Sequence, residues 1–254
     1  MKSNIAIIFA GGSGVRMGSG LPKQFLEVNG KPIIIHTLEI FEDHPDIDGI
    51  YVACKEEYID RLNRFTKLFM ITKVRGIVPG GSTGQDSIYN ALKAASADYP
   101  DDSTALIHDG VRPCITAETI DDALASVREY GNAVICTPMY ETPVQSESGK
   151  DVETLPARSS FYTAQAPQCF HLGEILGVHE AVRKENPDYI GIVDSCTLMK
   201  QAGYDIHIVE GPRGNIKVTT PEDMFVFKAM LEYRETQNVF GFGVRDLDSR
   251  MKKG

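Results

Sequence analysis

The sequence predicts an α/β fold in which a mostly parallel sheet carries helices on both of its faces. Residues 5–8 form a short apolar run of mainly β-branched side chains, which is typical of a strand buried on both sides. A glycine-rich turn follows at residues 11–14, and further apolar runs alternate with segments of helical spacing. The 254 residues are enough for one large domain, which we assign to residues 1–235, with a C-terminal tail at 236–254.

The composition indicates a globular protein that can bury a core, with 42% apolar and 24% charged residues. A net charge of −9 argues against nucleic acid or an anionic membrane surface as the main partner. No apolar run approaches the ~20 residues of a membrane helix, and the first strand starts too early for a signal peptide, so we expect a cytoplasmic protein. The five cysteines are scattered without a Cys-x-x-Cys pair, which predicts reduced core residues.

The first glycine turn has the features of a phosphate-binding loop. Gly11, Gly12 and Gly14 lack side chains, so backbone N–H groups there can approach an anion. Arg16 and Lys23 add two cations nearby, which favours a triphosphate ligand. The turn has neither the Gly-Lys-Ser/Thr ending of a P-loop nor the third glycine of the dinucleotide fingerprint. The alternative is therefore a tight connection between strand and helix with no ligand.

The remaining elements follow from apolar spacing and turn signals. In chain order we expect a helix at 31–41, a strand at 50–54, a helix at 55–69, a helix at 87–95, a strand from 104, helices at 119–130 and 172–184, a strand at 204–210 and a helix from 221. The apolar run at 131–138 predicts a strand that leaves the sheet. Two short strands with a glycine turn between them then predict a β-hairpin arm at about 139–164. Such a ribbon is marginal alone, so the arm needs a partner.

Polar residues cluster where the strand from residue 104 ends. His108, Asp109 and Arg112 would lie at its carboxyl end, where open parallel sheets bind their ligands. A structural ion pair between Asp109 and Arg112 is the alternative. An acidic residue there can also assist Mg²⁺, which prefers oxygen ligands and keeps waters and substrate phosphates. The sequence leaves open whether Asp109 contacts the metal.

Three other hydroxyl or acidic positions have two readings each. Ser82 and Ser87 belong to a second glycine turn, where their hydroxyls can cap the following helix or meet a ligand. Asp194 precedes a helix expected from residue 195, so it can cap that helix or contact substrate. A lone lysine such as Lys217 is normally a solvated surface residue.

Several motifs together resemble one enzyme family. They are Ala-Gly-Gly-x-Gly-x-Arg-Met at 10–17, Leu-Pro-Lys-Gln-Phe at 21–25, His-Asp-x-x-Arg-Pro at 108–113 and Asn-Ile-Lys-Val-Thr-x-Pro-Glu-Asp at 215–223. The chain from residue 5 to about 230 is similar to the polyol-phosphate cytidylyltransferases, which act on 2-C-methyl-D-erythritol 4-phosphate or ribitol 5-phosphate. The resemblance implies a single Rossmann-like nucleotidyltransferase domain. It also implies a homodimer in which the arms of two subunits interlock.

The resemblance assigns roles to individual positions. Catalytic roles fall on Arg16, Lys23 and Lys217. The CTP-binding positions are Ala10, Gly11, Gly12, Gly14, Gly81, Ser82, Ser87 and Asp109. The acceptor-binding positions are Arg112, Thr142, Arg158 and Asp194, with Thr142 and Arg158 contributed by the partner's arm. The chain departs from the family at Gly84, where many relatives have arginine, and at Ala166, where a threonine is usual.

The implied reaction is attack by a polyol phosphate oxygen on the α-phosphorus of CTP, with loss of pyrophosphate. Mg²⁺ held mainly by the CTP phosphates is the implied cofactor, and the acceptor phosphate is already anionic, so catalysis consists of positioning and charge neutralisation. We expect D-ribitol 5-phosphate as the acceptor, with 2-C-methyl-D-erythritol 4-phosphate as the alternative. Two further readings are a nucleotide-sugar pyrophosphorylase that uses UTP or GTP, and a nucleotide sensor without catalysis.

Overall fold

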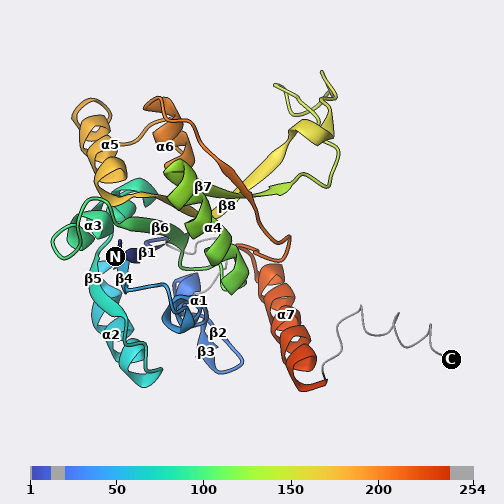
Figure 1. Cartoon of the computed structure of the whole chain (residues 1–254). Helices are drawn as coiled ribbons and strands as arrows, with labels where there is room; N and C mark the ends of the chain where they lie inside the picture. The colour runs from blue at the N-terminus through green and yellow to red at the C-terminus, as the bar shows by residue number, and fades with distance from the viewer. Residues whose placement is uncertain (1, 13–20, 241–254) are drawn as a thin grey trace.

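The computed structural model describes residues 2–12 and 21–240, which build a seven-stranded sheet between two layers of helices (Figure 1). In spatial order its strands are β5 (Val74–Pro79), β4 (Gly49–Cys54), β1 (Asn4–Ala10), β6 (Thr104–Asp109), β8 (Tyr162–His171), β7 (Asn132–Pro138) and β9 (Ile208–Glu210). All neighbouring pairs are parallel except those of β8, which is antiparallel to β6 and β7. The predicted α/β class with a mostly parallel sheet is confirmed.

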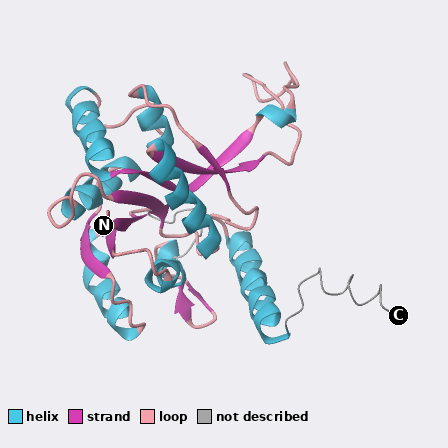
Figure 2. Cartoon of the chain, in the orientation of Figure 1, coloured by secondary structure: helices cyan, strands magenta, loops and turns pink. Residues whose placement is uncertain are grey.

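Helices cover both faces of the sheet, as Figure 2 shows in cyan around the magenta strands. One face carries α1 (Ile33–Asp43), α2 (Ile59–Leu68) and α4 (Ala117–Tyr130). The other carries α3 (Gly84–Ala95), α5 (Leu172–Glu185) and α6 (Ser195–Gln201). No helix of the described residues is long and apolar enough to cross a membrane.

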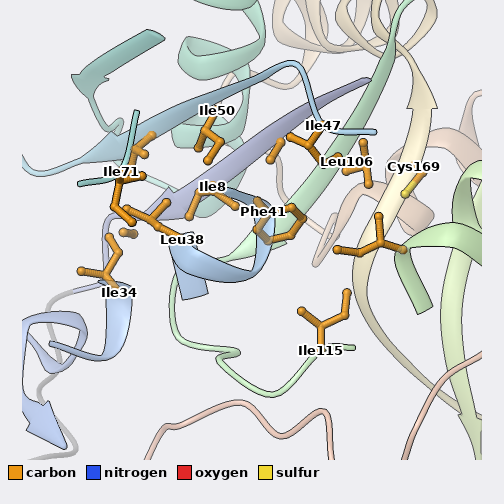
Figure 3. Packing of buried hydrophobic residues seen from close by; sticks show 14 of the residues in the cluster. Ile8, Ile34, Leu38, Phe41, Ile47, Ile50, Ile71, Leu106, Ile115 and Cys169 are labelled. Atoms are coloured by element: carbon orange, nitrogen blue, oxygen red, sulfur yellow. The ribbon is translucent and has the colours of Figure 1, made fainter. Parts of the chain in front are cut away.

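The central strand β1 supplies side chains to both cores. Ala6 and Ile8 belong to the cluster under α1, whereas Ile5 and Ile7 belong to the cluster under α3, because successive side chains of a strand point to opposite faces. Figure 3 shows Ile8 beside residues of α1 and β6 in the first of these clusters. A fully buried side chain of this size contributes about 1.5–3 kcal/mol. The apolar run at the start of the chain is therefore the centre of the fold.

The last helix, α7 (Pro221–Phe240), packs onto the loops beside the site through Met224, Phe227, Met230 and Leu231. Phe227 is fully buried against Val111, Cys114 and Val218, while Phe225 on the same helix is 76% exposed. The helix passes the domain boundary expected at residue 235, and residues 241–254 of the predicted tail lie outside the described residues.

The strand predicted at 131–138 does not leave the sheet. It forms β7, which lies between β8 and β9 inside the sheet. Its neighbour β8 was missed because Pro167 argues against a central strand. The structure accommodates this proline at an irregularity in the ladder, where pairing passes from Val134–Gln168 to Cys136–Ala164.

Other boundaries also differ from the expected ones. The helix expected at 31–41 begins two residues later, because Lys31 and Pro32 form β3 (Lys31–Pro32), which pairs with β2 (Glu27–Val28). A 3-10 turn occupies Glu56–Tyr58 before α2, and only the last three residues of the strand expected at 204–210 pair with the sheet. The helix expected at 87–95 begins at Gly84.

The arm at 139–164 projects from the sheet at the upper right of Figure 1. Its predicted pair of strands is reduced to a single antiparallel bridge between Gln145 and Thr154. A 3-10 turn at Arg158–Ser160 follows, and β8 then returns to the sheet. The hairpin is therefore far less regular than expected, in keeping with the weakness of an isolated ribbon.

Candidate functional site

The two glycine turns meet at the carboxyl ends of β1 and β5. A Cβ added to Gly11 would lie 3.0 Å from the Ser87 hydroxyl oxygen, so the first turn approaches α3 as closely as a glycine allows. Gln24 holds the first turn from the other side, because its Nε2 donates to the Ala10 carbonyl at 2.5 Å. Backbone groups of Ala10, Gly11 and Gly12 therefore lie where the sequence placed a phosphate loop.

Two of the predicted residues of this loop, Gly14 and Arg16, lie outside the described residues. Lys23 is described and occupies a half-buried position in the 3-10 turn Lys23–Phe25. Gln24 in the same turn is buried, so the turn packs directly against the first glycine loop.

The second turn is ordered by hydrogen bonds among its own residues. Ser87 Oγ accepts from Gly81 N at 3.1 Å and donates to the Thr83 carbonyl at 3.0 Å. Ser82 Oγ donates to Asp86 Oδ2 at 2.7 Å. Neither serine caps α3, contrary to that reading of the sequence. Thr83 is the cap, and it forms a reciprocal capping box with Asp86, which is why the helix begins early.

Asp86 is also bound from a distant helix. Arg183 of α5 pairs with Asp86 Oδ1, and its guanidinium lies 4.3 Å from the ring centroid of Tyr89. Burial alone would raise the pKa of Asp86, but hydrogen bonds from Ser82, Thr83 and Arg183 lower it below its ordinary value. The second turn is thus held to α5 by an ionised carboxylate.

Asp109 at the end of β6 is the electrostatic centre of the site. Its Oδ2 accepts from Arg112 Nε at 2.8 Å, and its Oδ1 accepts from Lys217 Nζ at 2.6 Å. Asp109 is 6% exposed, and burial would raise its pKa, but Lys217 and Arg112 lower the pKa below its ordinary value. The ion pair with Arg112 expected as the simpler reading is present, and Lys217 joins it.

Lys217 reaches Asp109 because two remote loops are bound together. Arg112 Nη1 donates to the Asn215 carbonyl at 2.8 Å, and Val218 N donates to the Val111 carbonyl at 2.9 Å. Asn215 Nδ2 donates in turn to the Ala166 carbonyl at 2.7 Å. The bonds of Asn215 to Ala166 and Arg112 join residues 49 and 103 positions apart in sequence, which no local pattern could show.

A cavity of about 220 Å³ opens between β6, β8, α3 and α6 beside this cluster. Asp109, Arg112, Asp194 and Lys217 all line it. Asp194 caps α6, because its Oδ1 accepts from Thr197 N at 2.8 Å. The residue also lines the cavity, and a contact with substrate stays a prediction.

The two arm residues lie apart from this cavity. Thr142 and Arg158 are exposed and do not line the cavity, and Arg158 Nη1 donates to the Tyr140 carbonyl at 2.9 Å. The structure of one chain therefore does not unite them with Asp109 and Lys217.

Other residues at the site were missed by sequence reasoning. Thr83 and Asp86 could have been found from the Thr-x-x-Asp spacing of a capping box. Arg183 had no signal, because its partner is 97 residues away in sequence. Gln85, Gln165 and Ser195 line the cavity, and the sequence analysis assigned them no role.

An open, mostly parallel sheet whose glycine turns and cation-bound aspartate gather at its carboxyl edge is the arrangement of an α/β nucleotidyltransferase. The family described as IspD: 2-C-methyl-D-erythritol 4-phosphate cytidylyltransferase matches residues 4–233, and the chain belongs to this family. The suspected resemblance is confirmed, and the chain is a member of an enzyme class that transfers nucleotides.

Two curated relatives carry different acceptor names. The chain is 45% identical over 239 residues to the ribitol-5-phosphate cytidylyltransferase of Vibrio parahaemolyticus, across 94% of this chain and 100% of the relative. It is 37% identical over 233 residues to the 2-C-methyl-D-erythritol 4-phosphate cytidylyltransferase of Clostridium botulinum, across 91% of this chain and 99% of the relative.

Solved structures share the same fold. The 4-diphosphocytidyl-2C-methyl-D-erythritol synthase of Anaerococcus prevotii superposes with a TM-score of 0.77 at 26% identity, covering 91% of this chain and 96% of that one. The 2-C-methyl-D-erythritol 4-phosphate cytidylyltransferase of Francisella tularensis has a TM-score of 0.74 at 27% identity, covering 88% and 98%.

Proposed function

We propose that this chain transfers CMP from CTP to D-ribitol 5-phosphate, releasing pyrophosphate and forming CDP-ribitol. The observation that carries the proposal is the cluster of Asp109, Arg112 and Lys217 at the carboxyl edge, next to two glycine turns. Paired cations beside backbone N–H groups suit a reaction between two phosphates, where charge must be neutralised.

The choice of acceptor follows the relatives. A relative named ribitol-5-phosphate cytidylyltransferase is 45% identical over 239 residues, whereas one named for 2-C-methyl-D-erythritol 4-phosphate is 37% identical over 233 residues. The second acceptor stays a candidate because the family itself and the similar solved structures are described by it.

The mechanism needs no strong base, because the attacking phosphate oxygen is already anionic. That oxygen forms a bond to the α-phosphorus of CTP as the bond to the bridging oxygen breaks, and pyrophosphate leaves with the electron pair. Lys217 supports this role because its side chain is 41% exposed while Asp109 holds its ammonium group at the cavity. Arg16, Lys23 and the N–H groups of the first turn would hold the triphosphate.

The donor set bears on the proposed cofactor. Among the described residues no group of three or more His, Cys, Asp and Glu could hold a metal ion, and both oxygens of Asp109 already accept from cations. This donor set fits a Mg²⁺ ion held mainly by the CTP phosphates and not by a cluster of protein carboxylates. When bound, the ion would neutralise charge on the triphosphate and the departing pyrophosphate.

The two departures from the family lie in different surroundings. Nothing lies within 4 Å of a Cβ added to Gly84, so this position is open and a side chain such as arginine would fit there. Ala166 is buried and lines the cavity, and its methyl group occupies the position where a hydroxyl is usual. Both departures are compatible with CTP binding through the backbone of the turns.

A homodimer would complete the acceptor site. The arm is joined by a single β-bridge, and six of its large apolar side chains are exposed. These are Tyr140, Val144, Val152, Leu155, Phe161 and Tyr162. Exposed apolar surface of this kind marks an interaction site. We infer that a second copy covers the arm and that Arg158 and Thr142 enter the partner's site.

Pyrophosphate release with CTP and each acceptor tests the function. We expect kcat/KM with D-ribitol 5-phosphate to exceed that with 2-C-methyl-D-erythritol 4-phosphate by at least about tenfold. The reverse preference would overturn the acceptor assignment. Turnover only with UTP or GTP and a sugar phosphate would indicate a pyrophosphorylase, and no turnover with any pair would indicate a sensor.

Lys23→Ala tests the catalytic assignment. We expect kcat to fall about 10²–10³-fold, with a smaller change in CTP affinity, because charge on the α-phosphate grows in the transition state. Lys67→Ala, at the exposed end of α2, is the control for loss of a lysine elsewhere. An unchanged turnover number for Lys23→Ala would refute the role.

A further inference from the structure

We propose that Gln85, Gln165 and Ser195 form a subsite that reads the hydroxyl groups of the acceptor. The proposal rests on the transferase function above and specifies how the acceptor is chosen. None of the three belongs to a motif that assigned a role, yet all three line the same cavity as Asp109 and Lys217.

Each of these residues has a buried polar atom without a hydrogen-bond partner among the described residues. The atoms are Gln85 Oε1, Gln165 Oε1 and Ser195 Oγ. Gln85 is 4% exposed and Ser195 is 1% exposed. Nearly all buried polar atoms in folded proteins are hydrogen-bonded, because an unpaired one destabilises the fold. Three such atoms around one cavity therefore indicate a ligand that supplies the missing partners.

The three residues are held in place by separate elements. Gln85 lies in the first turn of α3, which the Thr83–Asp86 capping box fixes. Gln165 lies in β8 at the irregular part of the ladder with β7. Ser195 is the first residue of α6 and follows the cap residue Asp194. The subsite therefore exists only where three elements converge.

The neighbouring amide is already satisfied and cannot take the same role. Gln168 Nε2 donates to Asp194 Oδ2 at 2.9 Å, and Gln168 Oε1 accepts from Cys196 N at 2.8 Å. Gln168 thus acts as a fixed wall. This leaves Gln85, Gln165 and Ser195 as the groups with unused bonding capacity, and all can accept a hydrogen bond from a hydroxyl.

Charged groups of both signs line the cavity. Lys217 and Arg112 supply cations that are paired with Asp109, and Asp194 supplies a carboxylate that accepts from Gln168. A phosphate is favoured near the cations and disfavoured near Asp194, while neutral hydroxyls can bind beside it. The cavity of about 220 Å³ is smaller than the ~300–1,000 Å³ usual for larger ligands. It suits a short unbranched chain with one phosphate and several hydroxyls.

The unpaired polar atoms of the subsite also disfavour an acceptor substrate with fewer hydroxyls, such as 2-C-methyl-D-erythritol 4-phosphate, which has one hydroxyl fewer than D-ribitol 5-phosphate and carries a methyl branch. A site built to bind a hydroxyl discriminates strongly against an analogue without it, because its own polar atoms then stay unpaired. The subsite would thereby favour a linear polyol phosphate over a methyl-branched one.

The test uses Gln85→Met and Ser195→Ala, which remove the polar atoms with little change of volume. We expect each variant to raise KM for D-ribitol 5-phosphate by about tenfold or more, with KM for CTP within about twofold. The preference for D-ribitol 5-phosphate over 2-C-methyl-D-erythritol 4-phosphate should fall in parallel. Gln201→Met, at the exposed end of α6, is the matched control.

Calorimetric titration of D-ribitol 5-phosphate into each full-length variant gives a readout besides turnover. Weaker binding by both variants supports the subsite, and unchanged binding and KM in Ser195→Ala and Gln85→Met overturns it. If one variant fails to fold, as judged by its thermal transition, the other decides. A wild-type enzyme that turns over no acceptor would instead refute the proposed function, so the two failures are distinguishable.

Discussion

Two regions that carry the predicted acceptor residues differ sharply in how they are held. At the sheet edge, Asp109 is buried and accepts from Arg112 and Lys217, and hydrogen bonds join the loops on which these residues lie. In the arm, Arg158 is exposed and the strands are joined by one bridge. One chain is enough to order the first region, whereas the second has few contacts of its own.

The difference has a simple physical origin. The sheet edge is supported by a core in which each strand is packed on both faces, so its polar groups are fixed by buried neighbours. The arm extends beyond that core and exposes apolar residues such as Leu155, at 68%. A segment of this kind is ordered by what covers it. We therefore expect mutations at the edge to affect folding and turnover, and mutations in the arm to affect turnover alone.

Asp109→Asn should have the largest effect. It leaves Arg112 and Lys217 side by side without their carboxylate, so we expect kcat/KM to fall about 10³-fold. The free energy of unfolding should fall by about 2–3 kcal/mol, less than the ~3–5 kcal/mol for a fully buried pair, because Lys217 is partly solvated. Urea unfolding and pyrophosphate release measure the two effects. Asp102→Asn at an exposed position is the control, and an unaltered unfolding midpoint in Asp109→Asn would show that the edge is not held by this cluster.

Arg158→Ala should reduce kcat/KM for the acceptor about 10²-fold without changing the free energy of unfolding. Lys150→Ala at the tip of the same arm is the control, since Lys150 is equally exposed. If Arg158→Ala lowered the free energy of unfolding as much as Asp109→Asn does, the contrast between the two regions would be contradicted.

Mixing subunits extends this test. If Arg158 enters the partner's site, a one-to-one mixture of Arg158→Ala and Asp109→Asn subunits forms hybrid dimers with one complete site. Such a mixture should recover about a quarter of wild-type activity by statistical assembly. Activity no higher than the sum of the separate variants would place both residues in the site of the same subunit.

Acid should weaken the core that supports the edge. Burial lowers the pKa of His108 to about 4 and that of His179 to about 3, below the value of about 6.5 in an unfolded chain. The unfolded state therefore binds more protons, and stability, complete above pH 6.5, falls as the pH drops toward 4. His108 alone should cost roughly 2 kcal/mol at pH 5 relative to pH 7.

Urea unfolding at pH 7 and pH 5 measures this loss. In His108→Gln, the difference in the free energy of unfolding between pH 7 and pH 5 should be smaller by the roughly 2 kcal/mol assigned to His108. The arm at 139–164 contains no histidine. While the domain stays folded, the rate at which a protease cleaves the arm should therefore change little between pH 7 and pH 5. Equal stability at both pH values would contradict the prediction.

Arg183→Met should have the smallest of these effects. It removes the partner of Asp86 and so loosens the second glycine turn, and we expect KM for CTP to rise about tenfold with kcat nearly unchanged. Lys184→Met, the exposed neighbour on α5, is the control. A fall in kcat with unchanged KM would show that Arg183 acts on the chemical step instead of on the turn.

Local patterns predicted the elements that depend on neighbouring residues. The apolar run at 5–8 identified the central strand, and the position of Asp194 identified the cap of α6. The end of the strand from residue 104 likewise placed Asp109 at the carboxyl edge. Local patterns failed where strand pairing was remote in sequence. Pro167 argued against a strand at β8, and only the pairing of β8 with β6 and β7 in the tertiary structure shows it to be one.

The sequence alone determined the class of fold, the two glycine turns and some ionisable residues of the site, such as Asp109 and Lys217, because hydrophobic period, backbone freedom and charge are properties of short segments. Tertiary structure decided that Lys217 binds Asp109, that Arg183 binds Asp86, and that three unpaired polar atoms line one cavity. Those contacts join residues from different elements, and their geometry depends on how strands and helices pack across the whole domain.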